Sequence, residues 1–171
     1  MNLRKLKLKD APLMLEWMHD GFVIKYMQAD FQSKTEDDCR RFITDSWNDR
    51  KNLHMAIVDN DDIYQGTVSL KHIAGSSAEF AITIRASAMG KGVSSAAMEQ
   101  MLKIGFAKLH LSEIYWCVSP ENVRAVRFYD KNGYKRINPP ENLARGYTAA
   151  QISSYIWYQE TRKGDTPSRN N

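Results

Sequence analysis

One stretch of the chain carries a strand pattern, a glycine-rich turn and a helix pattern in immediate succession: residues 79–107, EFAITIRASAMGKGVSSAAMEQMLKIGFA. Residues 79–84 alternate between apolar side chains and polar or small ones, as a strand with one buried face does. Gly90-Lys91-Gly92 then leads into a long helix. The apolar side chains of this helix have the spacing that suits packing on a sheet: Val93, Ala96, Ala97, Met101 and Ile104. The order predicts a βα unit.

A second βα unit follows the first. Residues 113–118 form a compact β-rich run, and Ser119-Pro120-Glu121-Asn122 supplies the capping residues of a helix that ends at Gly133. Residues 21–33 have no clear period, so we expect a loop there. The other predicted elements are a strand at Leu3–Leu8, helices from Asp10 to about His19 and from Thr35 to Trp47, a hairpin of residues 53–58 and 63–73, and a strand at Ile152–Tyr158.

Length and composition indicate a single domain. The chain has 171 residues, enough for one hydrophobic core and too few for two ordinary domains. It contains no run of about 20 apolar residues, as a membrane span requires, and its first residues lack the apolar run of a signal peptide. Cys39 and Cys117 are the two cysteines and lack metal-ligand spacing, so we expect a reducing cytoplasm. Residues 164–171 are polar and are expected to form a flexible tail.

The charge of the chain bears on its partners. A net charge of +4 favours an anionic partner but is too small to select one class of partner. The basic residues are spread along the sequence, without a run that would track a phosphate backbone. This distribution argues against nucleic-acid binding.

The glycine-rich turn at residues 89–95 is suited to a phosphate, because glycine allows close approach to the free N–H groups at the start of a helix. Taken alone, the pattern is equally typical of an ordinary loop. Asn122 and Tyr129 lie seven residues apart, about two helical turns, so both polar groups point the same way.

Glu79, Gly90-Lys91-Gly92 and the segment 122–134 occur in the order and spacing of GNAT-family N-acetyltransferases, which the chain resembles over nearly its whole length. The resemblance implies one α/β domain over residues 1–163, with a twisted mixed sheet splayed into a V and helices on both faces. It also implies acetyl-CoA as co-substrate, bound between the two βα units, and no metal. The wider resemblance is to the branch of ribosomal-protein N-acetyltransferases, which also includes polyamine acetyltransferases and amino-sugar nucleotide acetyltransferases.

The resemblance assigns the cofactor contacts. The backbone of Ile82, Thr83 and Ile84 would pair with pantetheine, and Asn122 would fix the cofactor arm. The family has Gln or Arg where this chain has Met89, and Gly or Ala where it has Ser94. Met89 thus lacks a side-chain donor although its N–H remains, whereas Ser94 offers a hydroxyl. The pyrophosphate would lie on Met89, Gly90, Lys91, Gly92, Val93, Ser94 and Ser95.

Acetyl transfer to an amine needs one group that accepts a proton and one that donates a proton. An alkyl amine with a pKa of about 10.4 is mostly protonated at neutral pH. The resemblance makes Glu79 the base, acting through water, and Tyr129 the acid that protonates the departing thiolate. Without the resemblance, Glu79 would be a solvated residue on an open sheet face and Tyr129 a packed helix residue. Cys117 has no evident base beside it, so a buried strand thiol is favoured over a nucleophile.

The acceptor is expected to be the primary amine of a small molecule. The segment from Trp17 to Met27 resembles that of GNAT enzymes that acetylate nucleotide-linked amino sugars. Aromatic side chains there could stack on rings: Trp17, Phe22, Tyr26 and Phe31. The same aromatics could instead form a hydrophobic plug on the sheet.

Three alternatives complete the prediction. The acceptor could be the N-terminus of a protein or peptide, or the chain could be a non-catalytic module that binds acyl-CoA or a protein. Exposed sheet edges also suggest a homodimer.

Overall fold

The computed structural model describes residues 1–140 and 146–162. Within these residues, seven strands form one mixed sheet in the order β1-β2-β3-β4-β5-β7-β6. The strands are β1 (Asn2–Lys5), β2 (Leu53–Val58), β3 (Tyr64–Ala74), β4 (Ser77–Ile84), β5 (Glu113–Val118), β6 (Lys135–Ile137) and β7 (Ile156–Thr161). The helices are α1 (Ala11–Met18), α2 (Gly21–Ile24), α3 (Glu36–Ser46), α4 (Val93–Ala107), α5 (Val123–Lys131) and α6 (Ala149–Ser154).

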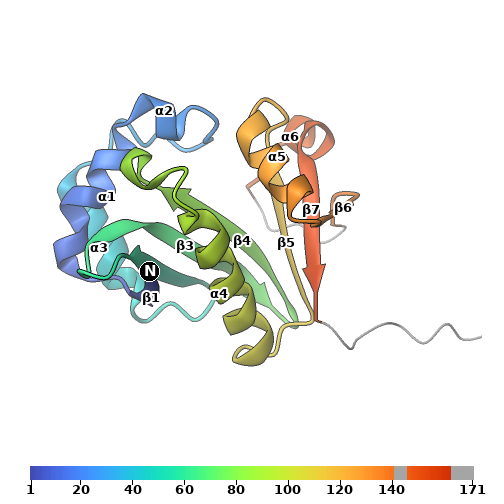
Figure 1. Cartoon of the computed structure of the whole chain (residues 1–171), viewed down its shortest axis with the longest axis horizontal. Helices are drawn as coiled ribbons and strands as arrows, with labels where there is room; N and C mark the ends of the chain where they lie inside the picture. The colour runs from blue at the N-terminus through green and yellow to red at the C-terminus, as the bar shows by residue number, and fades with distance from the viewer. Residues whose placement is uncertain (141–145, 163–171) are drawn as a thin grey trace, which may run out of the picture.

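The centre of the sheet is splayed. β4 and β5 are parallel and pair through three residue pairs, from Ser77 with Glu113 to Glu79 with Tyr115. Beyond Glu79 the two strands separate, β4 continuing to Ile84 and β5 to Val118. Figure 1 shows the resulting V, with α4 against one arm and α5 on the other. This opening is the feature of the fold that positions the site.

Two hydrophobic clusters cover the two faces of the sheet. Consecutive strand residues point to opposite faces, and the adjacent Ala56 and Ile57 belong to different clusters. The cluster under α4 contains Ile57, Val68 and Phe80, whereas α1 and α3 pack on Ala56 from the other side. Helices therefore lie on both faces, as predicted.

The buried side of α4 is rotated from the predicted one. Val93 and Ala96 are only partly buried, whereas Ala97 and Met101 are fully buried, as predicted. The observed buried residues are Ala97, Met98, Met101, Leu102 and Gly105. A Cβ at Gly105 would lie 2.6 Å from Ile114 Cδ1, so the end of that side chain would have to shift. The helix lies close against β5 at this glycine.

The first strand is shorter than predicted. β1 ends at Lys5 instead of Leu8, and residues 8–10 form a 3-10 turn. The carboxylate of Asp10 explains the change, because it accepts hydrogen bonds from the Lys7 N–H and from both terminal nitrogens of Arg4, each at 2.8 Å. The hydrogen bonds of Asp10 thus end the strand earlier than the alternating pattern predicts.

The end of the chain also differs from the prediction. The strand expected at Ile152–Tyr158 begins only at Ile156, because Thr148 and Gln151 form a reciprocal capping box that starts α6. β6 was not predicted, and the expected loop at 21–33 contains the single turn α2. The tail predicted at 164–171 lies outside the described residues.

Among the described residues, no helix combines the length and the apolar character needed to cross a membrane. β1 and β6 are the outer strands of the sheet. Pairing of a second copy along either edge stays a prediction.

Candidate active site

The free edge of β4 forms one side of the opening. β3 pairs with β4 as far as Ile84, but beyond Glu79 the opposite edge of β4 pairs with no other described strand. Backbone N–H and C=O groups along such an edge are available to an extended partner. Ile82, Thr83 and Ile84 lie on this edge, where the family resemblance places their backbone contacts with pantetheine.

The turn after β4 presents the start of α4. Gly90 and Gly92 both have positive φ, 77° and 76°, which non-glycine residues rarely adopt. Gly92 is the N-cap residue, and no side chain caps the helix. The N–H groups of the first turn, from Val93 to Ser95, therefore have no partner within the helix. A phosphate group fits this end of the helix.

Met89 takes no part in that arrangement. Its side chain packs against both hydrophobic clusters, and its N–H donates to the carbonyl of Ala86 at 3.1 Å. The expectation that this N–H remains available is therefore wrong. The donors that fit a phosphate come from the residues after Gly92.

Asn122 begins the helix on the other arm. It is the N-cap residue of α5, and its Oδ1 accepts a hydrogen bond from the Ala125 N–H at 3.2 Å. The oxygen is used in capping, whereas the side-chain NH2 donates to no other described residue. Only this NH2 remains to contact a cofactor arm.

Glu79 lies where the V closes and is 3% exposed. Its Oε1 accepts a hydrogen bond from the Tyr147 hydroxyl at 2.7 Å and pairs with Lys71 Nζ at 3.0 Å. Its Oε2 is buried without a hydrogen-bond partner in the described part of the chain, and His72 Nε2 is 3.8 Å away. Glu79 is thus a buried, paired carboxylate and not a solvated residue on an open face.

The partners of Glu79 were not predicted. Lys71 is directly opposite Glu79 in the β3–β4 register, so the hairpin pattern could have suggested it. Tyr147 is 68 residues away in sequence, and no local pattern marks it.

Tyr147 also connects Glu79 to the β5 arm, because its hydroxyl accepts a hydrogen bond from the Cys117 thiol at 3.4 Å. Burial raises the pKa of Cys117 to about 11, and it is also the main cause that raises the pKa of Tyr147. Both groups are protonated at neutral pH. Cys117 is therefore a poor nucleophile, in line with the favoured interpretation of this residue.

Tyr129 lies on the other arm, in α5. It is 7% exposed and packs among aromatic rings, with Tyr158 at 5.0 Å and Trp116 at 5.5 Å between ring centroids. Its hydroxyl has no hydrogen-bond partner in the described ranges. Burial raises the pKa of Tyr129, so the phenol stays protonated at neutral pH. The ring is packed as the alternative without the resemblance expects, and the unpaired O–H remains available as a donor.

The four aromatics predicted to bind substrate do not converge. Trp17 is buried, with its Nε1 donating to the Tyr64 hydroxyl at 3.0 Å, and its ring contacts Phe31 edge to face at 5.1 Å. Phe22 is 66% exposed on α2, and Tyr26 lies beside Lys25 Nζ at 5.1 Å. Trp17 and Phe31 pack in the core and also line a cavity between α3 and the sheet. Phe22 and Tyr26 do not line this cavity.

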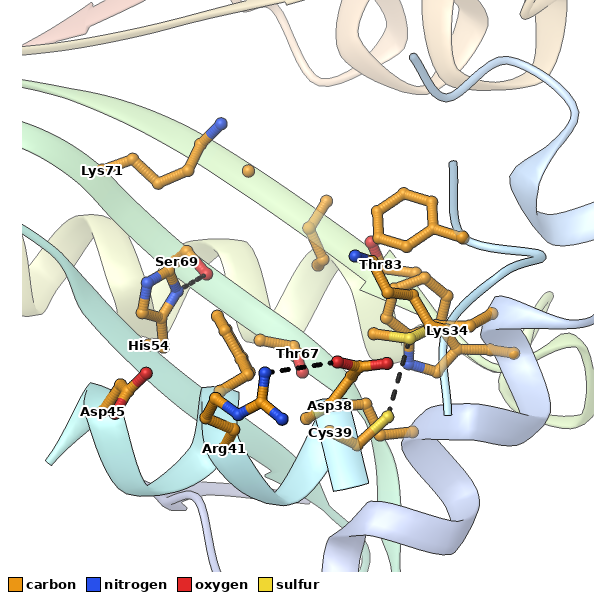
Figure 2. A pocket seen from close by; sticks show the side chains of 17 residues that line it. Lys34, Asp38, Cys39, Arg41, Asp45, His54, Thr67, Ser69, Lys71 and Thr83 are labelled. Carbon is orange, nitrogen blue, oxygen red and sulfur yellow. Dashed lines mark hydrogen bonds and ion pairs between the residues drawn. The ribbon is translucent and has the colours of Figure 1, made fainter. Parts of the chain in front are cut away.

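A cavity of about 500 Å³ lies between α3 and the sheet. Figure 2 shows Asp38 and Arg41 of α3 on one side and Ser69 and Lys71 of β3 on the other. The cavity reaches β4 at Ala81–Thr83, beyond the last pair with β5. It is lined by Met14, Trp17, Met18, Phe31, Lys34, Asp38, Cys39, Arg41, Phe42, Asp45, His54, Thr67, Ser69, Lys71, Ala81, Ile82 and Thr83.

Within residues 1–140 and 146–162, no cluster of three or more His, Cys, Asp or Glu side chains could hold a metal ion. The groups that this region offers are the free edge of β4, the start of α4, one buried carboxylate and one buried phenol.

Comparison with known proteins adds family information. A family model described as an acetyltransferase (GNAT) domain matches residues 1–135. An uncharacterized N-acetyltransferase p20 of Bacillus licheniformis is 28% identical over 156 residues, covering 88% of this chain and 85% of the relative.

Solved structures share the fold. A GNAT-family acetyltransferase from Bacillus anthracis is 24% identical with a TM-score of 0.72, covering 93% of each chain. The spermidine N-acetyltransferase from Vibrio cholerae, solved in complex with CoA and spermine, is 22% identical with a TM-score of 0.73, covering 92% of each chain. These matches confirm the predicted α/β fold. They do not distinguish the predicted branch.

Proposed function

This chain belongs to the GNAT acetyltransferase family and is an acetyl-CoA-dependent N-acetyltransferase, and we propose that its acceptor is the primary amine of a small molecule. The observation that carries the acceptor proposal is the cavity of about 500 Å³ that reaches β4 at Ala81–Thr83. Its volume is that of a small-molecule site, and the β4 residues that it reaches lie beyond the last pair with β5.

The chain offers a binding surface for the co-substrate that fits its chemistry. The free edge of β4 at Ile82–Ile84 suits an extended amide-containing arm, and the uncapped start of α4 at Val93–Ser95 suits phosphate. The side-chain NH2 of Asn122 lies at the start of the opposite helix. These residues would hold acetyl-CoA across the V.

When bound, acetyl-CoA supplies a thioester whose C–S bond breaks as the amine forms its N–C bond, so one proton must leave nitrogen and one must reach sulfur. In our proposal Glu79 takes the first proton through a water molecule, using the unpaired Oε2. Tyr129 donates the second from its unpaired hydroxyl. Lys71 and Tyr147 hold the carboxylate of Glu79 in place.

The amino-sugar acceptor expected from the sequence is not carried forward. The neighbouring structures give it no support, and its four aromatic residues are divided between the core and the exposed surface. The Vibrio cholerae enzyme is a spermidine acetyltransferase, which suggests small amines as a class. An N-terminal peptide acceptor remains the alternative, and a reducing cytoplasm remains the proposed location.

The first experiment measures cofactor binding and turnover separately. Acetyl-CoA at 100 times its Kd should add about 2.7 kcal/mol to the free energy of unfolding, seen as a shift in the thermal midpoint. Release of free CoA thiol is then measured with small primary amines and with peptides that have free N-termini. Faster release with peptides than with every small amine would overturn the acceptor proposal.

Two variants test the roles of the residues. Tyr129→Phe and Glu79→Gln should each bind acetyl-CoA with unchanged affinity and lose acetyl transfer. Full turnover in Tyr129→Phe would remove the acid assignment, and full turnover in Glu79→Gln would remove the base assignment.

A further inference from the structure

We propose that the acceptor is an acidic amine, with one primary amine, an apolar or aromatic body and one anionic group, bound in the cavity beside α3. The inference rests on the proposed function, because it names the class of small-molecule amine. It is carried by the charges and the apolar walls of the cavity.

The apolar walls favour a ligand with a hydrophobic body. Trp17 and Phe31 meet edge to face on one side of the cavity, and Phe42 and His54 meet edge to face at 4.8 Å on another. Met14 and Met18 add flexible apolar surface. A linear polyamine would offer these side chains only the short methylene runs between its charges.

The charged side chains of the cavity are mainly basic. Lys34, Arg41 and Lys71 line it, against the two carboxylates Asp38 and Asp45. Burial lowers the pKa of His54, so this imidazole is neutral at neutral pH, and its Nδ1 is bonded to Ser69 Oγ at 2.7 Å. Lys71 is paired with Glu79, so Lys34 and Arg41 are the cations of the lining left to meet an anionic group.

The acidic groups are also largely engaged. The carboxylate of Asp38 accepts hydrogen bonds from the Thr35 N–H at 2.9 Å and hydroxyl at 2.8 Å, and it pairs with Arg41 at 3.6 Å. Glu79, next to the cavity, is paired with Lys71. Asp45 is the one lining carboxylate for which the described residues supply no hydrogen bond or ion pair.

The basic groups have more capacity left. Lys34 forms no ion pair with the described residues, and the single long contact of Arg41 with Asp38 leaves most of its five N–H donors available. Figure 2 shows the guanidinium of Arg41 beside the cavity. An anionic group on the acceptor finds donors at this position, while the amine faces the β4 edge at Ala81–Thr83.

A matched series of amines tests the charge preference. The compounds are 4-(aminomethyl)benzoate, 4-methylbenzylamine and 1,4-bis(aminomethyl)benzene, which share ring and amine and differ in an anionic, neutral or cationic para group. We expect kcat/KM, measured by CoA release, to fall in that order, by about fivefold per step, because partly exposed charge pairs contribute about 1 kcal/mol.

Two variants, Arg41→Gln and Arg40→Gln, test whether the preference for an anionic para group depends on Arg41. Arg40 is the next residue of α3, pairs with Glu36 and does not line the cavity, so its substitution removes the same charge elsewhere. Arg41→Gln should reduce the ratio of kcat/KM for the benzoate over the methyl compound about fivefold. Arg40→Gln should leave this ratio unchanged.

Other outcomes separate this inference from the proposed function. A preference for the dication, or for spermidine over all three compounds, would overturn the acidic-amine inference while small-molecule acetylation stands. Acetyl-CoA binding with no CoA release from any small amine would overturn the proposed function. In that case, a thermal shift caused by 4-(aminomethyl)benzoate in the unsubstituted protein, and lost in Arg41→Gln, would still support the binding site. If no such shift occurs, both the proposed function and the acidic-amine inference are overturned.

Discussion

The two arms of the V hold their key polar groups in different ways. On the β4 arm, Glu79 is buried but bound by Lys71 and by Tyr147, which reaches across from the β5 side. On the β5 arm, Tyr129 is buried among aromatic rings, and its hydroxyl is bonded to no described residue. Polar partners place the carboxylate, whereas packing alone places the phenol.

Because of this difference, we expect substitutions on the two arms to affect the stability and the activity of the protein separately. Removing a polar partner of Glu79 should destabilise the fold, because a buried acceptor loses a hydrogen bond. Removing the hydroxyl of Tyr129 should leave the fold intact, because no bond is lost. Four experiments test the comparison, beginning with the largest expected effect.

Tyr129→Phe should reduce kcat by about 100-fold, since a general acid contributes 10²–10⁴-fold. The aromatic contacts are kept, so the midpoint of urea unfolding should change little. Steady-state CoA release and urea titration measure the two effects. Tyr134→Phe is the control, because Tyr134 packs on the same Trp116 ring and should keep full activity. A large loss of stability in Tyr129→Phe would show that its hydroxyl has a structural partner.

Tyr147→Phe should lower the free energy of unfolding by about 2 kcal/mol, because hydrogen bonds to charged groups contribute 1.5–3 kcal/mol. The main bond lost is the one at 2.7 Å to the buried carboxylate of Glu79, and the Cys117 thiol also loses its acceptor at 3.4 Å. Urea unfolding measures the change, with Tyr26→Phe as the control at a tyrosine whose ring lies beside Lys25 Nζ. If stability is unchanged, Lys71 alone is sufficient to hold Glu79.

Gly92→Ala should destabilise the protein by about 1 kcal/mol, since a left-handed conformation costs a non-glycine residue 1–2 kcal/mol. The variant should also weaken acetyl-CoA binding if the turn before α4 holds phosphate. Gly21→Ala is the control, because an added Cβ there meets nothing within 4 Å and its φ is not positive. Calorimetric titration with CoA gives the affinity, and an unchanged Kd in Gly92→Ala would argue against phosphate binding at this turn.

The smallest expected effect concerns pH. Burial lowers the pKa of His54 below its ordinary value of about 6.5, so the unfolded chain binds a proton there before the folded protein does. Stability should therefore fall as the pH drops through about 6.5, and His54→Gln should make this fall shallower. Urea midpoints at several pH values test it. His110→Asn, at an exposed residue, should leave the slope unchanged, and an equal change in both variants would exclude burial as the cause.

The predictions from sequence succeeded where the signals are local. The β4 strand, the glycine turn and the start of α4 follow one another along the chain, so their order and spacing predicted the β4 arm of the V. The predicted hairpin and the β-rich run gave β2 and β5 with their observed bounds, Leu53–Val58 and Glu113–Val118. Local patterns failed where side-chain hydrogen bonds changed the backbone, as at Asp10 and Thr148.

The candidate site was predicted in part. Glu79 and Tyr129 were chosen by resemblance, and the structure places them on opposite arms of the same opening. Their roles stay predictions. Tyr147 and the cavity under α3 could not have been predicted, because they depend on segments that approach only after the sheet has formed. The four aromatics of residues 17–31 could not be sorted into buried and exposed by composition alone.

The sequence by itself determined the two central βα units, the free N–H groups at the start of α4 and the family, because these depend on residues close together in the chain or on motif spacing. Only the tertiary structure decided that Glu79 is buried and paired, that Met89 packs inward, and that a mainly basic cavity opens onto β4. Burial and charge balance depend on which distant side chains come together.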